Sequence, residues 1–458
     1  MQQKLVFRGG KIVLPDAVMQ GDLVVENGKN TELSSCAATD GCRVVDVSGR
    51  VLLPGGIDSH IHVTEPSPNS GREDWTTASR SAAAGGVTTI VQMPVNDPPI
   101  SNRANFIRTR DIAEKKSCVD FALWGALIPS SVAHLKELYG LGCVAFKGFM
   151  SHGCEFFPRI DDVNLFRAME LAHGFGDIVG LHAEHADLAE LGAGRLEAEG
   201  CTDYARYDEA RPWWTEAEAI ERALLLAQVT GAEVYFAHLC AAQGVELVRS
   251  AKRRGQRVIA ETCPHYLLFS REACREKGSF AKCNPPLRSE ENREQLWNAI
   301  FDGTLDVLGS DHGIYRDGEP NPDESFWQAP AGFPGIDVAL TAFYSEAVVK
   351  RGLPLPRAAA LAAGNAAKIF GLRGKGALLP GMDADIVVMD VHRDWRYDAA
   401  KSFSRVKFTH GIYQDYLLHC RVDAAYVRGT LVYDGESITV EPGYGTFIAR
   451  DNKERGII

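Results

Sequence analysis

The feature that most constrains the fold of this chain is a series of eight short apolar segments, each rich in β-branched and aromatic residues. Their hydrophobicity is nearly continuous, whereas a strand with one solvent-exposed face alternates apolar and polar residues. Continuous apolar runs of this length are typical of strands that are buried on both faces of a parallel sheet. The segments occupy residues 57–62, 87–93, 121–127, 144–150, 178–184, 234–239, 258–263 and 305–312.

Segments with helical spacing of apolar residues separate these runs. Residues 162–173 and 216–231 show this spacing, and Thr215 followed by Glu218 is a candidate N-terminal cap of the second segment. Eight strands that alternate with helices predict an α/β fold of the (β/α)8 type, a TIM-type barrel. The functional groups of such a barrel are expected at the carboxyl ends of its strands.

The two ends of the chain have a different pattern from the middle. Both contain short alternating segments with Gly and Asx turns, which are typical of antiparallel strands. We therefore expect residues 55–374 to form the barrel. Residues 1–54 and 375–458 are expected to pair into one small β-sandwich domain formed from both chain ends.

Composition argues against several classes of partner. The formal net charge of −11 disfavours binding to nucleic acid or to an anionic membrane surface. No apolar stretch reaches about 18 residues, so no membrane partner is expected. The 11 cysteines show no paired metal-binding pattern and are expected to be reduced thiols of a cytoplasmic protein. Cys36 and Cys42 lie close in sequence, but free thiols are favoured there as well.

Side chains that bind metal ions stand at or near the ends of the apolar runs. His60 and His62 are two residues apart in one run, so they project from the same side of a strand. His182, His238 and Asp311 lie near the ends of later runs. Neutral imidazoles and a carboxylate are ligands that suit a zinc-like divalent ion. The set predicts a metal site at one mouth of the barrel.

Lys147 is the unusual member of this set, because it lies in the middle of an apolar run. Burial disfavours a charged amine, so the pKa of Lys147 should fall. A neutral amine can react with carbon dioxide to give a carbamate, whose two oxygens can bridge two metal ions. Two ions about 3.5–4 Å apart can hold a hydroxide and polarise a carbonyl. Asp311 could then take the proton of the attacking hydroxide and return it to a leaving nitrogen, which predicts hydrolysis of a C–N bond.

The motifs around these residues resemble those of the cyclic amidohydrolases, which include dihydroorotases, hydantoinases, dihydropyrimidinases and allantoinases. The resemblance spans nearly the whole chain and rests on GGIDSHIHVTEP, AAAGGVTTIVQMPVNDPP, CPHYL, GSDH and GNAAKIFGLRGKGALLPGMDADIVVMD. It implies two divalent metal ions, expected to be zinc, with Asp311 as the catalytic base and an N6-carboxylated Lys147 as the bridge. The first ion would be bound by His60, His62, Lys147 and Asp311, and the second by Lys147, His182 and His238. The family also implies a homo-oligomer, either a tetramer or a dimer.

Within this family the chain is most similar to allantoinases. Dihydroorotases carry an arginine where this chain has Thr64, so their anchor for a substrate carboxylate is missing. HIHVTEP, AKCNPPLR and GFPGI read like allantoinase segments. The resemblance implies a small cyclic ureide as substrate, with allantoin opened to allantoate in purine catabolism. The residues expected to contact the substrate are Thr64, Asn96, Asn284 and Tyr315, although Tyr315 could equally well fill the pocket wall.

Two segments depart from the allantoinase pattern and leave alternatives open. Residues 313–315 follow Ser-Asp-His with Gly-Ile-Tyr, and residues 406–413 replace a basic segment of the family. A hydantoinase or dihydropyrimidinase acting on another cyclic ureide or imide is the main alternative, and a dihydroorotase is less favoured. Lys147 disfavours a one-metal deaminase. A non-catalytic binding protein is least favoured, because every ligand-type residue is present.

The remaining histidines are expected to lie outside the metal-binding set. His312 should support the metal site from behind, and His265 should have a structural role. His152, His173, His185 and His410 are expected on the surface or in loops. Trp213 and Trp214 are expected to serve helix packing or a subunit contact.

Overall fold

The middle of the chain forms the barrel, in a computed structural model that describes residues 4–68, 72–321 and 324–456. Its parallel strands follow the hydrogen-bonded orders β15-β6-β7-β8 and β14-β13-β12-β11-β10-β9. The chain continues from β8 to β9 and from β14 to β15, so the two sheets close into one ring and confirm the predicted (β/α)8 barrel. The strands are β6 Gly56–His62, β7 Val87–Gln92, β8 Asp120–Leu123, β9 Gly125–Ala126, β10 Phe146–Phe149, β11 Ile178–His182, β12 Glu233–Phe236, β13 Val258–Thr262, β14 Val307–Leu308 and β15 His312–Gly313.

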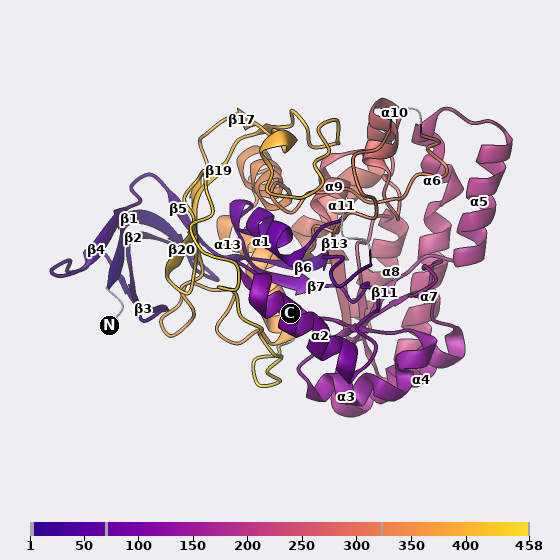
Figure 1. Cartoon of the computed structure of the whole chain (residues 1–458), viewed down its shortest axis with the longest axis horizontal. Coiled ribbons are helices and arrows are strands. Elements are labelled where there is room, and N and C mark those ends of the chain that lie inside the picture. Colours follow the sequence, from indigo (N-terminus) through magenta and orange to yellow (C-terminus); the bar gives the residue numbers. More distant parts are fainter. Residues whose placement is uncertain (1–3, 69–71, 322–323, 457–458) are drawn as a thin grey trace.

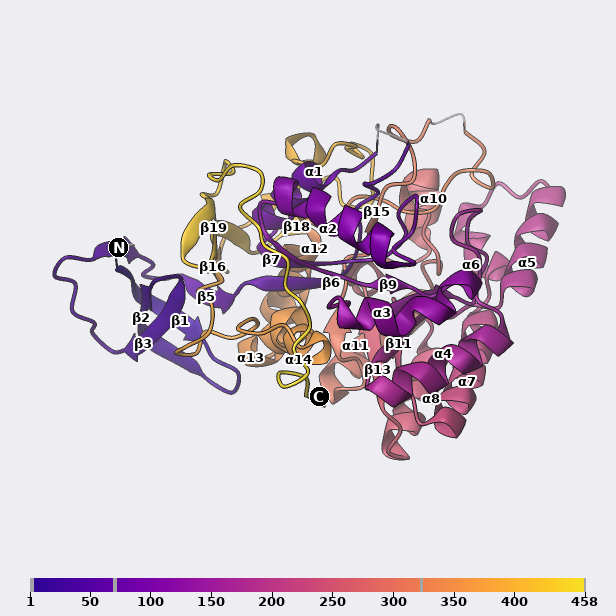
Figure 2. The same ribbon diagram turned by 60° about the horizontal axis from the view of Figure 1, so that its bottom comes forward.

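Helices pack around the outside of this ring (Figures 1 and 2). The longer ones are α1 Trp75–Ala84, α2 Arg103–Lys116, α4 Asp162–Phe175, α5 Ala186–Ala198, α7 Trp213–Thr230, α8 Ala242–Arg253 and α11 Glu290–Asp302. The shorter ones are α3 Leu135–Gly140, α6 Tyr207–Ala210, α9 Pro264–Leu268, α10 Glu272–Lys277, α12 Ala339–Tyr344, α13 Leu355–Ala359 and α14 Asn365–Phe370. Short 3-10 and π-helical turns connect several of them.

The helix α4 illustrates why the predicted helical segments form. Its buried residues Leu165, Ala168, Met169 and Ala172 recur every three or four positions, which places them on one face. The Asp161 side chain accepts a hydrogen bond from the Asn164 amide and caps the first turn. These features confirm the helix that the spacing of residues 162–173 predicted.

The helix α7 begins earlier than predicted. Trp213 is its first residue and Pro212 occupies the N-cap position. The prediction of Thr215 as the cap was wrong, because this residue lies inside the first turn, where its hydroxyl donates to the Pro212 carbonyl at 2.8 Å. Trp213 and Trp214 are 46% and 43% exposed, so they are not part of the core. A subunit contact through them remains a prediction.

The β-sandwich is built from both ends of the chain, as predicted, and lies beside the barrel (Figure 1). Its strands follow the order β20-β19-β16-β5-β1-β2-β3, with β4 beside β1. The two chain ends meet where β5 pairs with β16, and one apolar cluster contains Phe7, Leu23, Leu52, Ile386 and Tyr426. The strands are β1 Leu5–Val13, β2 Val18–Glu26, β3 Lys29–Ser34, β4 Arg43–Asp46, β5 Val51–Pro54, β16 Ile386–Asp390, β19 Arg421–Val427 and β20 Thr430–Tyr433; β17 Trp395–Arg396 and β18 Leu417–Leu418 form a separate pair.

Parts of the C-terminal region also contact the barrel. Tyr397 donates from its hydroxyl to the Asp337 carboxylate at 3.0 Å, and Phe447 forms a parallel bridge with Phe121. The domain boundary at residue 375 therefore stays a prediction. The boundary near residue 54 also stays a prediction; it lies between β5, which ends at Pro54, and β6, which begins at Gly56.

Two further predictions concern the whole chain. Within the described residues, no helix combines the length and the apolar character needed to cross a membrane. All 11 cysteines are free thiols, including Cys36 and Cys42.

Candidate metal centre

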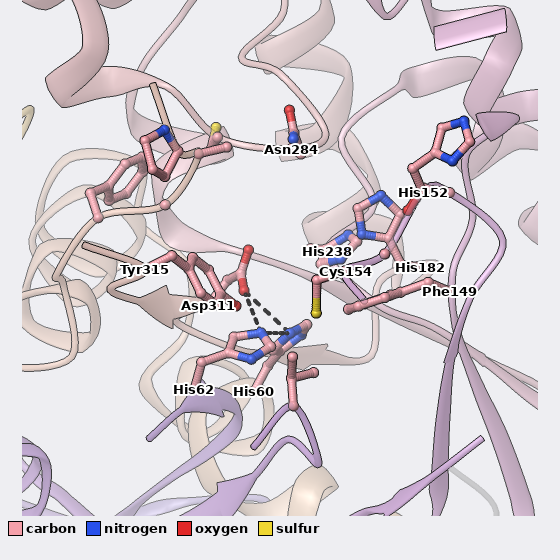
Figure 3. Close-up of a pocket in the computed structure, with 18 of the residues that line it drawn as sticks. His60, His62, Phe149, His152, Cys154, His182, His238, Asn284, Asp311 and Tyr315 are labelled. Atoms are coloured by element: carbon pink, nitrogen blue, oxygen red, sulfur yellow. Dashed lines mark hydrogen bonds and ion pairs between the residues drawn. The ribbon is translucent and has the colours of Figure 1, made fainter. Parts of the chain in front are cut away.

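His60 and His62 lie at the carboxyl end of β6, and their rings point toward Asp311 (Figure 3). The Nε2 atoms of the two histidines are 3.1 Å apart. They lie 3.2 and 3.3 Å from Oδ1 of Asp311. Both histidines are buried, and Asp311 enters from the loop between β14 and β15. Two imidazole nitrogens and one carboxylate oxygen thus converge on one point, as the ligands of a divalent cation do.

A second pair of imidazoles lies next to the first. His182 ends β11 and His238 follows β12. Their ring centroids are 4.4 Å apart, and the His238 ring is 5.2 Å from that of His60. Ligand atoms of His60, His238 and Asp311 all lie within 4.8 Å of one another. The predicted ligands from four separate strands or strand ends therefore gather at one mouth of the barrel.

Lys147 projects from β10 and is completely buried. Its Nζ atom has no hydrogen-bond partner in the described part of the chain, and it lies 5.7 Å from the centroid of the Phe149 ring. Burial lowers the pKa of Lys147 to about 8, against the opposing effect of the Glu261 and Asp311 carboxylates. An unpaired buried amine is costly, which makes Lys147 a candidate functional group.

The other charges of the site suit metal binding. Burial, together with neighbouring cationic groups, lowers the pKa of His60 and His238 well below the usual range, so both rings are neutral ligands. Burial alone would raise the pKa of Asp311, but His60 and His62 lower it below its ordinary value. The site therefore offers neutral nitrogens and an ionised oxygen.

Two buried carboxylates hydrogen-bond the imidazole rings of His60 and His182. Glu261 Oε1 lies 2.7 Å from Nδ1 of His60, and the same oxygen accepts the His238 amide at 2.8 Å. Glu184 Oε2 lies 2.6 Å from Nε2 of His182 and also pairs with Arg211. Such carboxylates fix the orientation of metal-binding histidines. Neither glutamate was predicted from the sequence, although each is a charged residue inside or at the end of an apolar run, which is the signal that identified Lys147.

The backbone is strained at two of the proposed ligands. His238 has a φ of 41° and Asp311 a φ of 49°, both in the left-handed region that residues other than glycine seldom adopt. Strain of this kind concentrates at functional sites, where surrounding structure enforces it. It turns these two side chains toward the mouth of the barrel immediately after their strands.

A pocket of about 510 Å³ opens above these residues. Two of the predicted substrate contacts, Asn284 and Tyr315, line it, and Figure 3 shows Asn284 across its open centre from Asp311. The Tyr207 hydroxyl donates to Asn284 Oδ1 at 2.6 Å and fixes that amide. The Tyr315 ring lies 5.6 Å from the His62 ring.

Thr64 and Asn96 do not line this pocket. The Thr64 hydroxyl donates to the Glu73 carbonyl at 2.9 Å. The Asn96 amide donates to the carbonyls of Val63 and Glu65 at 3.0 and 2.8 Å. Their donors are used by backbone carbonyls, so both side chains bond the loop after β6. A contact between these two residues and the substrate stays a prediction.

Three other histidines lie near the site. Nδ1 of His312 accepts hydrogen bonds from the backbone amides of Gly335 and Ile336 at 3.2 and 3.4 Å. His312 does not line the pocket. His152 and His265 both line the pocket. His152 was expected on the surface or in a loop, and its side chain is 49% exposed at the rim, 2.9 Å from Glu190.

Comparison with known proteins agrees with this geometry. The model of the amidohydrolase family matches residues 51–414. The chain is 36% identical to an allantoinase of Deinococcus radiodurans, over 96% of this chain and 98% of that protein. It is 33% identical to an allantoinase of Bacillus velezensis, over 98% of each chain.

Solved structures with the same fold include a hydantoinase and a dihydropyrimidinase. An L-hydantoinase (dihydropyrimidinase) from Arthrobacter aurescens has a TM-score of 0.92 and 30% identity, over 97% of this chain and 99% of that one. A dihydropyrimidinase from Brevibacillus agri has a TM-score of 0.90 and 28% identity, over 98% and 99%. The chain is a hydrolase that belongs to the amidohydrolase family.

Proposed function

We propose that this protein opens a cyclic ureide ring by metal-dependent hydrolysis, with allantoin to allantoate as the preferred reaction. The observation that carries the proposal is the convergence of His60, His62 and Asp311 beside an unpaired, buried Lys147. The full-length similarity to allantoinases supports the choice of substrate.

The residues present fit a pair of divalent metal ions, for which zinc is the expected element. The donor set is neutral imidazole and ionised carboxylate, and the Lys147 amine is an orphaned polar group among these donors. The ions would supply a polarised substrate carbonyl and a water activated for attack. One ion would be held by His60, His62, Lys147 and Asp311, and the other by Lys147, His182 and His238.

Lys147 would serve this pair in its carboxylated form. The amine nitrogen bonds to the carbon of carbon dioxide and releases one proton, which leaves an anionic group with two oxygens. This reaction turns an unpaired amine into an anion suited to two cations, and it removes the cost of burying the amine without a partner.

Asp311 would move the proton that ring opening requires. As an ionised carboxylate it can accept a proton from the attacking water and return it to the ring nitrogen when the C–N bond breaks. Asn284 and Tyr315 would orient the ring from the pocket wall, since an amide and a phenol can each donate to a ureide carbonyl.

A second candidate is hydrolysis of a hydantoin or dihydropyrimidine ring. The similarity of the whole fold to an L-hydantoinase, with a TM-score of 0.92, favours it. A dihydroorotase is less favoured, because a threonine stands at position 64.

A substrate panel separates these candidates. Metal-loaded protein would be assayed with allantoin, hydantoin, dihydrouracil and dihydroorotate, with metal-loaded Asp311→Asn protein as the control for contaminating activity. We expect the highest kcat/KM for allantoin and loss of that activity in the control. A preference for hydantoin or dihydrouracil would favour the second candidate, and a preference for dihydroorotate would contradict the interpretation of Thr64.

We also propose that the protein is a cytoplasmic homo-oligomer, a tetramer or a dimer. The free thiols support a reducing compartment. The two half-exposed tryptophans that begin α7 support a contact between subunits. Light scattering on the wild type and on a Trp213→Ser, Trp214→Ser double variant tests this part, and equal masses would contradict the role of the tryptophans.

A further inference from the structure

His265 is a pocket residue for which the proposed metal-dependent reaction has no role. It lies in the first turn of α9, immediately beyond the carboxyl end of β13. The residue is only 1% exposed, yet it lines the pocket that also contains Asn284 and Asp311. It therefore lies at the end of the barrel where the reaction would occur.

Neither ring nitrogen of His265 has a hydrogen-bond partner in the described part of the chain. The imidazoles of His60 and His182 differ in this respect, because Glu261 bonds His60 and Glu184 bonds His182. His265 is also absent from the cluster of converging metal-ligand atoms. A buried imidazole that lines a pocket with both ring nitrogens unpaired can hydrogen-bond a ligand in that pocket.

Neighbouring rings fix the orientation of this imidazole. The Tyr266 ring centroid lies 4.2 Å away, and the Phe333 ring packs edge-on at 5.1 Å. Burial lowers the pKa of His265 to about 4, so the ring is neutral near pH 7. A neutral imidazole offers one N–H donor and one nitrogen acceptor. A cyclic ureide carries complementary groups, the N–H and C=O of its amide bonds.

We propose that His265 hydrogen-bonds the ring amide groups of the bound ureide and orients the ring in the pocket. This inference rests on the proposed function and extends it, since it adds a residue that would bind the substrate directly and would not bind a metal ion. The contact is a neutral hydrogen bond, so a substrate ring without amide groups would not gain from it.

The test compares two variants of similar size. His265→Gln keeps a donor and an acceptor, whereas His265→Leu keeps the apolar volume but neither polar group. With allantoin, or whichever ring of the panel is the best substrate, we expect kcat/KM to fall about 10- to 100-fold in the leucine variant. The glutamine variant should stay within about 5-fold of the wild type. Metal content per chain and thermal unfolding are measured for both.

Equal losses in the two variants, or no loss in either, would overturn the proposal. A merely structural role would lower thermal stability or metal content in parallel with activity, and that result would also overturn it. If the leucine variant does not fold, the inactive, metal-loaded Asp311→Asn protein provides a separate readout. Its imidazole ¹⁵N signals that disappear when His265→Gln is added to it should shift when the best ring substrate of the panel is bound, and unchanged signals would contradict the contact.

Failure of the proposed function has a different signature. Metal-loaded wild-type protein would then open no ring of the panel, and the inference would fall with it. An active wild type with unaffected His265 variants would overturn only the inference.

Discussion

Lys147 and Lys375 are both almost completely buried, and their surroundings are opposite. Lys147 in the barrel mouth is 0% exposed and its amine has no hydrogen-bond partner among the described residues. Lys375 at the junction of barrel and sandwich is 3% exposed and contacts three carboxylates. Its Nζ atom lies 2.6, 2.7 and 3.0 Å from Asp120, Asp385 and Asp383.

The surroundings shift the pKa values of the two amines in opposite directions. Burial lowers the pKa of Lys147 to about 8. Burial would also lower the pKa of Lys375, but the Asp385 and Asp120 carboxylates raise it above its ordinary value. A buried lysine with several anionic partners is a structural group that joins two domains. A buried lysine without a hydrogen-bond partner is a candidate for chemistry, because no hydrogen bond offsets the cost of its burial.

The largest expected effect is the loss of activity in Lys147→Met. This substitution removes the group that would bridge both metal ions, so kcat should fall by about 10³-fold or more. Metal content, measured by atomic emission, should drop below two ions per chain. Lys375→Met is the matched control, because it makes the same substitution far from the pocket. Full activity of Lys147→Met would contradict a functional role for Lys147 and would end its contrast with Lys375.

Lys375→Met should instead affect stability. The change leaves the Asp120, Asp383 and Asp385 carboxylates without their shared cation, and breaking a buried ion pair in this way costs about 3–5 kcal/mol. The free energy of unfolding from denaturant titration is the measurement. Metal content of the folded protein should be unchanged. A loss below about 1 kcal/mol would show that the junction does not depend on this lysine.

A smaller effect is expected for Glu261→Gln, which keeps the shape of the side chain and removes its charge. Glu261 holds the His60 ring at 2.7 Å, so the variant should bind metal about 10- to 100-fold more weakly. Competition with a chelator of known affinity measures this change. Unaltered affinity would mean that the neutral amide orients His60 equally well.

The smallest effect is the one that contrasts the two lysines most directly. In metal-free protein, Lys147→Met should change the free energy of unfolding by less than about 1 kcal/mol, or raise it, because an unpaired polar group is replaced by an apolar one of similar length. Denaturant titration of the metal-free protein measures it beside Lys375→Met. A loss of several kcal/mol would mean that Lys147 has a structural partner after all.

Much of the site could be predicted because the functional groups of such a barrel lie at the carboxyl ends of its strands. His60, His62, Lys147, His182, His238 and Asp311 each interrupt or end an apolar run, and parallel strands bring those ends together. The fold was predictable for the same reason, since each run is long enough to be a buried strand. The proposed metal ligands and the barrel were thus predicted from one pattern.

The rest depended on contacts that a linear pattern does not contain. Thr64 and Asn96 have the right chemistry for a ureide, but the backbone of their own loop uses their donors. The role of Glu261 depends on the approach of β13 to the end of β6, which only the closed barrel creates. The helix α7 starts at Trp213, directly after Pro212, and not after the predicted cap Thr215. Proline is favoured near the beginning of a helix.

Carbon-13 NMR of metal-loaded protein prepared with ¹³C-labelled carbon dioxide tests the role of Lys147 most directly. If the buried amine carries the bridging carboxyl group, the wild type will show one carbamate signal per chain, and Lys147→Met will show none. A fully active, fully metallated wild type without that signal would contradict the assignment of Lys147 as the bridging residue.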